Sequence, residues 1–112
     1  MYQVYLTDHF LRRLKPYLKK FRNLENDLIE ALQNFTPKIS DQLGHKLYKI
    51  RLKSTDIPKG KSKSFRVIIF LLELKNVIVP IMIYFKSERQ DISEKEIEYH
   101  LEAVLIEIKK RK

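Results

Sequence analysis

The sequence contains no cysteine. Disulfide bonds, thiolate metal sites and thiol catalysis are therefore excluded, and a cytoplasmic location is the simplest expectation. Long apolar runs are also missing, because the longest ones, residues 67–72 and 77–85, are far too short to span a bilayer. Residues 1–4 show no charged segment that leads into an apolar one, so we expect no secretory signal and no membrane partner.

Motifs for cofactors and nucleophiles are absent as well. The sequence has no phosphate-binding P-loop, no glycine-rich dinucleotide fingerprint and no nucleophile elbow. Its acidic residues are scattered, and the three histidines, His9, His45 and His100, stand isolated without metal-ligand spacing. We therefore expect no metal and no cofactor, and we interpret His9 and His100 as structural or solvated.

Positive charge is what the chain has in excess. It carries 23 Lys and Arg against 14 Asp and Glu, a formal net charge of +9 over 112 residues. This excess favours a polyanionic partner, which could be a nucleic acid, an anionic membrane surface or an acidic protein. A merely soluble basic protein has the same composition, so the charge alone leaves these alternatives open. The length predicts a single domain, residues 1–112, with a modest core.

Hydrophobic periodicity predicts an α+β fold with a small antiparallel sheet, in the order β-α-α-β-β-β-α. Residues 2–6 have the alternation of a first strand. A helical period follows, in which Pro16 should kink or split the helix and Asn23 should cap a second one. The two helices form an N-terminal hairpin whose apolar faces are Phe10, Leu14, Leu18 and Phe21, then Leu24, Leu28, Ala31, Leu32 and Phe35.

The second half of the chain is predicted to form strands and a final helix. Residues 36–46 form a polar connection, and residues 48–53 then alternate apolar with basic side chains. The apolar stretches 65–72 and 77–86 predict a central antiparallel hairpin, although Pro80 fits an edge or a bulge better. Ser93 and Glu96 form a capping box that opens the last helix, whose apolar positions are Ile97, Leu101, Val104 and Ile108.

Basic side chains recur on one face of the predicted strands. Lys49, Arg51 and Lys53 share a face, Arg66 opens the next strand, and Tyr84 and Lys86 share a face at the end of the last one. Such a set suits metal-free RNA cleavage, in which the ribose 2′-hydroxyl attacks the adjacent phosphate. Arginine clamps the phosphorane oxygens, a lysine crowded by cations acts as general base, and tyrosine stacks on a base. The alternative is that these basic side chains have no catalytic role and only form the solvent-exposed face of a half-exposed strand.

Four segments in order resemble the RelE/ParE toxin superfamily, particularly the RelE- and HigB-like mRNA interferases of toxin–antitoxin modules. Residues 60–68, Gly-Lys-Ser-Lys-Ser-Phe-Arg-Val-Ile, are similar to the family's Gly-Lys-Ser-Gly-Gly-aromatic-Arg-Val-Ile segment. The other three resemble the helical hairpin, the basic strand, and the strand exit with helix entry, and they are residues 14–28, 48–52 and 84–93. The resemblance covers nearly the whole chain.

The resemblance implies ribosome-dependent cleavage of mRNA and a cognate antitoxin that silences the toxin. It implies that Arg66 stabilises the phosphorane, that Lys49 and Arg51 serve phosphate binding and base or charge roles, and that Lys86 or Arg89 supplies a second clamp. Further RNA contacts are expected from Lys53, Lys61, Lys63 and Arg89.

The sequence also departs from the family pattern. Lys63-Ser64 stands where the family has Gly-Gly, Ser87 where an arginine is frequent, and Ser93 where a tyrosine is usual. Tyr84 is a candidate substitute for that tyrosine, and the general base and acid stay unassigned.

Two alternative functions remain open at this stage. One is a ParE-like protein that poisons a topoisomerase without cutting RNA, and the other is a catalytically weak RNA-binding relative. The basic set of Lys49, Arg51 and Arg66 favours the nuclease, because a topoisomerase poison needs a protein-binding surface and not a phosphate-cleaving one.

Overall fold

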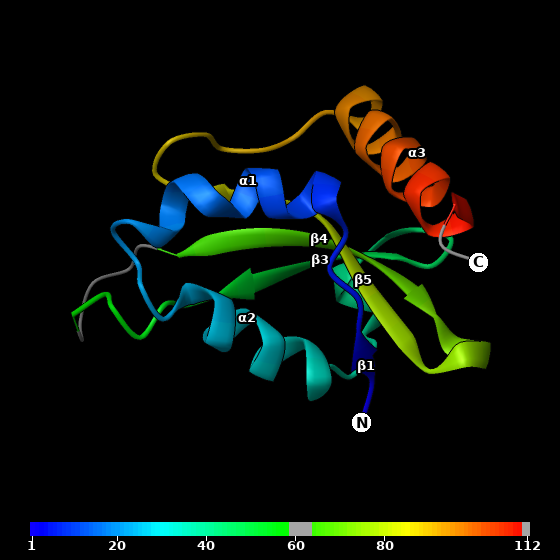
Figure 1. The fold of residues 1–112 in the computed structure, drawn as a ribbon, viewed down its shortest axis with the longest axis horizontal. Coiled ribbons are helices and arrows are strands. Elements are labelled where there is room, and N and C mark those ends of the chain that lie inside the picture. Colours follow the sequence, from blue (N-terminus) through cyan, green and yellow to red (C-terminus); the bar gives the residue numbers. More distant parts are fainter. Residues whose placement is uncertain (59–63, 111–112) are drawn as a thin grey trace.

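The computed structural model of the protein describes residues 1–58 and 64–110. Its helices and strands follow the order that the periodicity predicts, with the additional short strand β2 (Figure 1). In chain order the elements are β1 (Gln3–Val4), α1 (Asp8–Leu18), α2 (Leu24–Gln33), β2 (Gln42–Gly44), β3 (Leu47–Leu52), β4 (Phe65–Leu72), β5 (Val77–Phe85) and α3 (Glu94–Lys110), with short 3-10 turns at Ile39–Asp41 and Glu73–Lys75.

The strands form one sheet in the order β1-β5-β4-β3-β2. The pairs β2–β3, β3–β4 and β4–β5 are antiparallel, which confirms the predicted α+β class and the central β4–β5 hairpin. Two details differ from the prediction: β1 pairs parallel to β5, and β2 lies inside the stretch expected to be a polar connection. The three residues of β2 are all exposed, so no apolar alternation marks this strand in the sequence.

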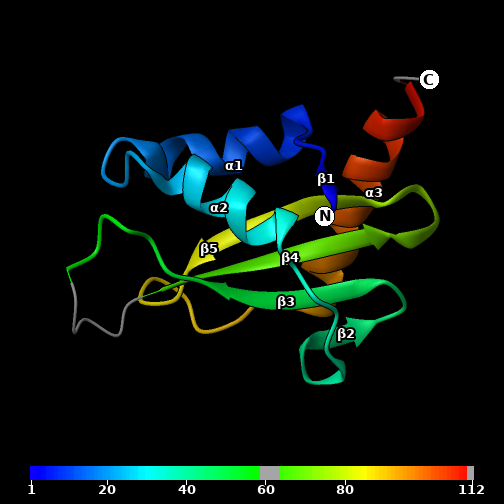
Figure 2. The same cartoon turned by 90° about the horizontal axis from the view of Figure 1, so that it is seen from below.

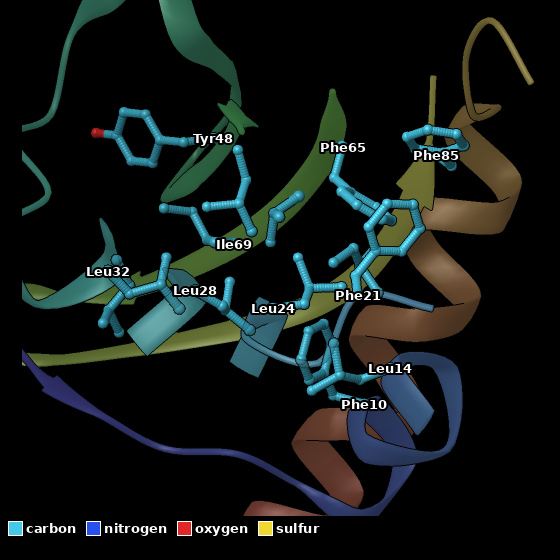
Figure 3. Packing of buried hydrophobic residues seen from close by; sticks show 14 of the residues in the cluster. Phe10, Leu14, Phe21, Leu24, Leu28, Leu32, Tyr48, Phe65, Ile69 and Phe85 are labelled. Atoms are coloured by element: carbon cyan, nitrogen blue, oxygen red, sulfur yellow. The ribbon is translucent and has the colours of Figure 1, made fainter. Parts of the chain in front are cut away.

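Helices α1 and α2 cover one face of the sheet, and α3 begins on the other (Figure 2). The first layer holds the larger core. Side chains of α1, α2 and the turn between them point toward strand residues (Figure 3), and the labelled ones are Phe10, Leu14, Phe21, Leu24, Leu28 and Leu32 against Tyr48, Phe65, Ile69 and Phe85. The second layer is smaller and packs α3 on the opposite face through Ile68, Val79, Ile81, Tyr84, Ile92 and Val104.

The structure corrects two predictions for the segment that joins α1 to α2, one about Pro16 and one about Phe21. The helix is not split at Pro16 but continues to Leu18, because a proline in the last turn removes only one backbone bond. Phe21 is buried from the turn itself, with its ring 5.1 Å from that of Phe65. Asn23 occupies the N-cap position of α2 but makes no side-chain cap bond. Its backbone and side-chain N–H groups instead donate to Asp56, at 2.8 and 3.0 Å.

Pro80 lies in a central strand, where the sequence analysis favoured an edge or a bulge. The register shifts at this point: Ile68 pairs with Met82, whereas the next residue, Ile69, pairs with Pro80. Ile81 is therefore the extra residue of a β-bulge, and the missing N–H of proline falls at the irregularity. The bulge accommodates proline opposite β4, and the pairing of β1 with β5 covers only Val77 and Ile78 and does not reach Pro80.

Candidate nucleic-acid interface

Two arginines and a tyrosine lie side by side across three strands. Arg51 of β3 is opposite Arg66 of β4, and Arg66 is opposite Tyr84 of β5. Residues directly opposite in antiparallel strands project from the same face of the sheet. The structure therefore brings these sequence-predicted residues into one row, on the face opposite α1 and α2.

Two lysines flank this row. Lys49 precedes Arg51 by two residues and so shares its face. Lys86 follows β5, where its backbone N–H donates to the Ser64 carbonyl at 2.9 Å. Lys53 is exposed just beyond β3, and neither its side chain nor that of Arg51 makes a hydrogen bond or ion pair with a residue that the structure describes. Lys61 and Lys63 lie outside the described residues. We call Lys49, Arg51, Arg66, Tyr84 and Lys86 the cation face.

Ser64 orients the Arg66 guanidinium. Its hydroxyl accepts a hydrogen bond from Arg66 Nη1 at 2.6 Å, and the Phe65 carbonyl accepts a longer one at 3.5 Å. Arg66 is half-buried and Ser64 is buried, so this contact is sheltered from water. The serine at a position where the family motif has glycine thus fixes the arginine and leaves most of its donors for a ligand.

Tyr84 lies beneath the surface of the cation face. The residue is 1% exposed, and the Arg89 guanidinium carbon is 5.7 Å from the ring centroid. Burial raises the pKa of Tyr84, the nearby Asp91 carboxylate raises it further, and Arg66 and Arg89 oppose both effects. The buried hydroxyl has no hydrogen-bond partner among the residues described. Stacking of this ring on a base requires Arg89 to move.

The connection between β5 and α3, residues 86–93, supplies internal partners for several cations. Lys49 Nζ lies 3.2 Å from Asp91 Oδ1, and Lys86 Nζ donates to the Gln90 carbonyl. Arg89 makes a bidentate contact with Glu96, in which Nη1 donates to Oε2 at 3.1 Å and Nη2 donates to Oε1 at 2.7 Å. Its Nε donates to the Asp91 carbonyl at 3.0 Å. Arg89, predicted to bind RNA, is therefore paired within the protein.

Asp91 and Glu96 were missed as site residues by the sequence reasoning. Glu96 was visible only as part of the capping box, which the structure confirms: its backbone N–H donates to Ser93 Oγ at 3.2 Å. Bonds from Arg89 hold the pKa of Glu96 below its usual value. The Ile92 N–H and the Lys49 ammonium similarly lower the pKa of Asp91. Nothing in the spacing of Asp91 indicated its role.

A cavity of about 440 Å³ lies beside Lys49 and Asp91. Apolar side chains from β2, β3, the connection and the start of α3 form part of its wall, namely Leu43, Leu47, Ile92 and Ile97. Glu94 and Glu98 complete the lining.

Away from the cation face, His9 and His100 form a buried pair, which corrects the view of them as isolated. His9 Nε2 lies 2.8 Å from His100 Nδ1, and the residues are 5% and 7% exposed. Burial, followed by Arg13, lowers the pKa of His9 to about 4, and the pKa of His100 is lowered by the same two causes. Within residues 1–58 and 64–110, no cluster of three His, Cys, Asp or Glu side chains is placed to hold a metal.

Comparisons with known proteins complete this picture. In the described part of the chain, no helix has the length and apolar character needed to cross a membrane. No curated protein matches the sequence. Among solved structures, a double arginine-to-alanine mutant of the E. coli toxin RelE in the free state is similar, with 20% identity, 80% of this chain and 87% of that chain covered, and a TM-score of 0.47.

The family comparison covers nearly the whole chain. Residues 2–110 match the family described as the RelE toxin of the RelE/RelB toxin–antitoxin system. A match of this extent includes every helix and strand of the fold. The protein therefore belongs to the RelE family of toxin–antitoxin toxins.

Proposed function

We propose that this toxin is an endoribonuclease that cuts mRNA on the ribosome and so arrests translation. One observation carries the proposal: Arg51, Arg66 and Tyr84 form a continuous row between Lys49 and Lys86. Like charges directly opposite each other, as in Arg51 and Arg66, destabilise an antiparallel sheet. An anionic ligand between them would remove that cost, which favours a phosphate-binding role for the row.

The proposed reaction needs charge stabilisation and proton transfer. The 2′-oxygen forms a bond to phosphorus, the bond from phosphorus to the 5′-oxygen breaks, and the products are a 2′,3′-cyclic phosphate and a 5′-hydroxyl. Arg66, held by Ser64, stabilises the negative non-bridging oxygens together with Arg51. Lys49 and Lys86 hold neighbouring phosphates, and Lys53, Lys61 and Lys63 extend the RNA contact, joined by Arg89 once it leaves Glu96. The candidates for moving the proton from the 2′-hydroxyl to the leaving oxygen are Lys49, Lys86 and Tyr84.

Membership of the family implies a cognate antitoxin partner. We place the reaction in the cytoplasm, where ribosomes and mRNA are the other partners. An antitoxin segment with acidic and apolar side chains is suited to cover the cation face, since complementary charge both steers association and blocks the site.

Primer extension on mRNA after induction tests this function. Cuts should appear with the wild-type toxin, disappear with Arg66→Ala, and persist with Arg12→Ala, which removes an exposed arginine of α1. The same cuts should require ribosomes when the purified toxin is added to mRNA. Growth arrest with a DNA-damage response and without mRNA cuts would instead indicate the topoisomerase poison.

A further inference from the structure

The site of the proposed RNA contact already contains a negatively charged group of the protein itself. Asp91 Oδ1 accepts a hydrogen bond from Lys49 Nζ at 3.2 Å and another from its neighbour's backbone, Ile92 N–H, at 2.8 Å. Its pKa is lowered by these two bonds and by the charges of Lys49 and Lys86. An ionised carboxylate therefore lies against the lysine that precedes the arginine row.

The same connection binds the other movable cations. Lys86 is bonded to the Gln90 carbonyl, and Arg89 to the Asp91 carbonyl and the Glu96 carboxylate. Of the cations on the cation face, Arg51 and Arg66 are the two that make no hydrogen bond or ion pair with this connection among the described residues. The cation face is thus partly neutralised from within.

The Tyr84 hydroxyl shows that this arrangement leaves a polar group unsatisfied. It is buried, which raises its pKa, and no contact of this hydroxyl has the geometry of a full hydrogen bond in the described part of the chain. The nearby Asp91 carboxylate raises this pKa further by charge and by a weak hydrogen bond, against Arg66 and Arg89. Buried hydroxyls without a partner cost free energy and are rare in native proteins. An added anion at this point would give the hydroxyl an acceptor.

We infer that Asp91 is an internal competitor of RNA: its carboxylate occupies the place on Lys49 that an RNA phosphate takes on binding. This inference rests on the proposed function, which makes the cation face an RNA site. Binding of RNA then requires Asp91 to leave Lys49. The vacated Lys49 ammonium and the Tyr84 hydroxyl both donate to the arriving phosphate, which offers anionic oxygens as the carboxylate does.

The geometry of the pair makes such an exchange feasible. The side chains of Lys49 and Asp91 are 30% and 67% exposed, so their attraction is screened by water and salt. A phosphate carried by a polyanionic strand also gains from Arg51 and Arg66, whereas Asp91 contacts neither of them. Asp91 therefore weakens RNA binding without preventing it.

The experiment measures binding without cleavage. The probe is a single-stranded RNA with 2′-O-methyl riboses, whose blocked 2′-oxygen cannot attack phosphorus. Asp91→Asn should bind this probe about two- to fivefold more tightly than the wild type, since the displaced ion pair is exposed and weak. The slope of log affinity against log salt should change little, because Lys49 neutralises a phosphate in both complexes and the variant only removes the internal competitor.

Two controls separate competition from a general change of charge. Glu98→Gln removes the same charge from an exposed residue that lines the same cavity, and it should change affinity by much less. In a Lys49→Gln background, Asp91→Asn should give no gain. Unchanged or weaker binding by Asp91→Asn overturns the inference, as does an equal gain from Glu98→Gln or a gain that persists without Lys49.

Failure of this inference is distinguishable from failure of the proposed function. The inference is judged by the affinities of the unreactive probe, and the nuclease by Arg66-dependent cuts in mRNA. Tighter binding of Asp91→Asn together with lost cleavage still supports the competition and adds a second role for the carboxylate. Arg66-dependent cuts with no Asp91 effect on binding refute the competition and leave the nuclease standing.

Discussion

Two groups of titratable side chains in this protein differ in how water reaches them. On the cation face, Lys49, Arg51 and Lys86 are exposed or half-buried, and the internal partners of the two lysines come from one surface connection. Between α1 and α3, the ring nitrogens of His9 and His100 meet in a buried contact. Exposed ion pairs contribute little to stability and exchange readily, whereas a buried polar contact is costly to break. The first group is suited to a ligand and the second to holding helices together.

The contact between α1 and α3, which we call the seam, has a second polar part. Glu107 of α3 accepts hydrogen bonds from the first backbone N–H groups of α1, at 2.5 Å from Asp8 and 3.0 Å from His9. Thr7 caps the same helix end through a 3.1 Å bond to the Phe10 N–H. A carboxylate at a helix N-terminus satisfies unpaired donors and the helix dipole together. The seam thus joins α3 to the opposite helical layer.

The largest expected effect separates activity from stability at the cation face. Arg66→Ala should lower the rate of mRNA cleavage by about 10²–10³, the usual loss when one donor to a developing oxyanion is removed. Arg66→Lys should fall between the wild type and Arg66→Ala, because lysine keeps the charge and loses the fork of donors. The free energy of unfolding in urea should change by about 1 kcal/mol or less. A large loss of stability with an unchanged cleavage rate would show that Arg66 stabilises the fold and does not act on RNA.

Acidification should act on the seam first. The pKa of His9 falls from 6.5 in the unfolded chain to about 4 in the folded protein, so the unfolded chain binds more protons between these values. The stabilising contribution is complete above pH 6.5 and is lost as the pH falls toward 4, up to about 3 kcal/mol. His100 acts in the same direction. The surrounding charges are Arg12, Arg13 and Glu107 near His9, and Arg13, Glu96 and Arg89 near His100.

Urea unfolding at pH 7, 6 and 5 measures this dependence. The double variant His9→Leu/His100→Leu removes both titrating groups and should show a flatter profile over this window. A wild-type profile as flat as that of the double variant would show that protonation of the pair does not change the free energy of unfolding.

A single substitution in the seam should cost more than the double one. His9→Leu leaves the His100 ring nitrogen buried without its partner, at an expected cost of about 1–3 kcal/mol. The double variant replaces both partners by apolar groups and should recover part of this loss. His45→Leu, at an exposed histidine, is the control and should change stability by about 0.5 kcal/mol or less. RNA affinity should be the same in all three variants, because none of these histidines makes a hydrogen bond with the cation face among the described residues.

The smallest effect concerns the cap on α1. Glu107→Ala should lower the free energy of unfolding by about 1 kcal/mol, since two N-terminal N–H groups lose their acceptor and Thr7 still satisfies a third. Glu102→Ala, an exposed glutamate of the same helix, is the matched control. Equal effects of the two substitutions would show that Glu107 contributes only helix charge.

Local patterns determined much of the fold and the composition of the site. An alternating strand fixes which side chains share a face, so Lys49 and Arg51 could be placed together before any packing was known. The capping box of Ser93 and Glu96, the helical hairpin and the apolar β4–β5 pair are likewise encoded within short stretches. These features depend on residues that are neighbours along the chain, and backbone geometry alone converts their spacing into structure.

Tertiary structure alone decided the contacts between distant segments. The pairing of His9 with His100, the reach of Glu107 to α1 and the ion pair of Lys49 with Asp91 join residues separated by 91, 98 and 42 positions. The burial of Tyr84 under Arg89 arises in the same way, from the path of the chain between β5 and α3. Hydrophobic periodicity and composition carry no information about such long-range contacts, because these contacts follow from how two layers pack on one sheet. The sequence by itself therefore indicated which charges this toxin presents, and the fold decided which of them are already paired.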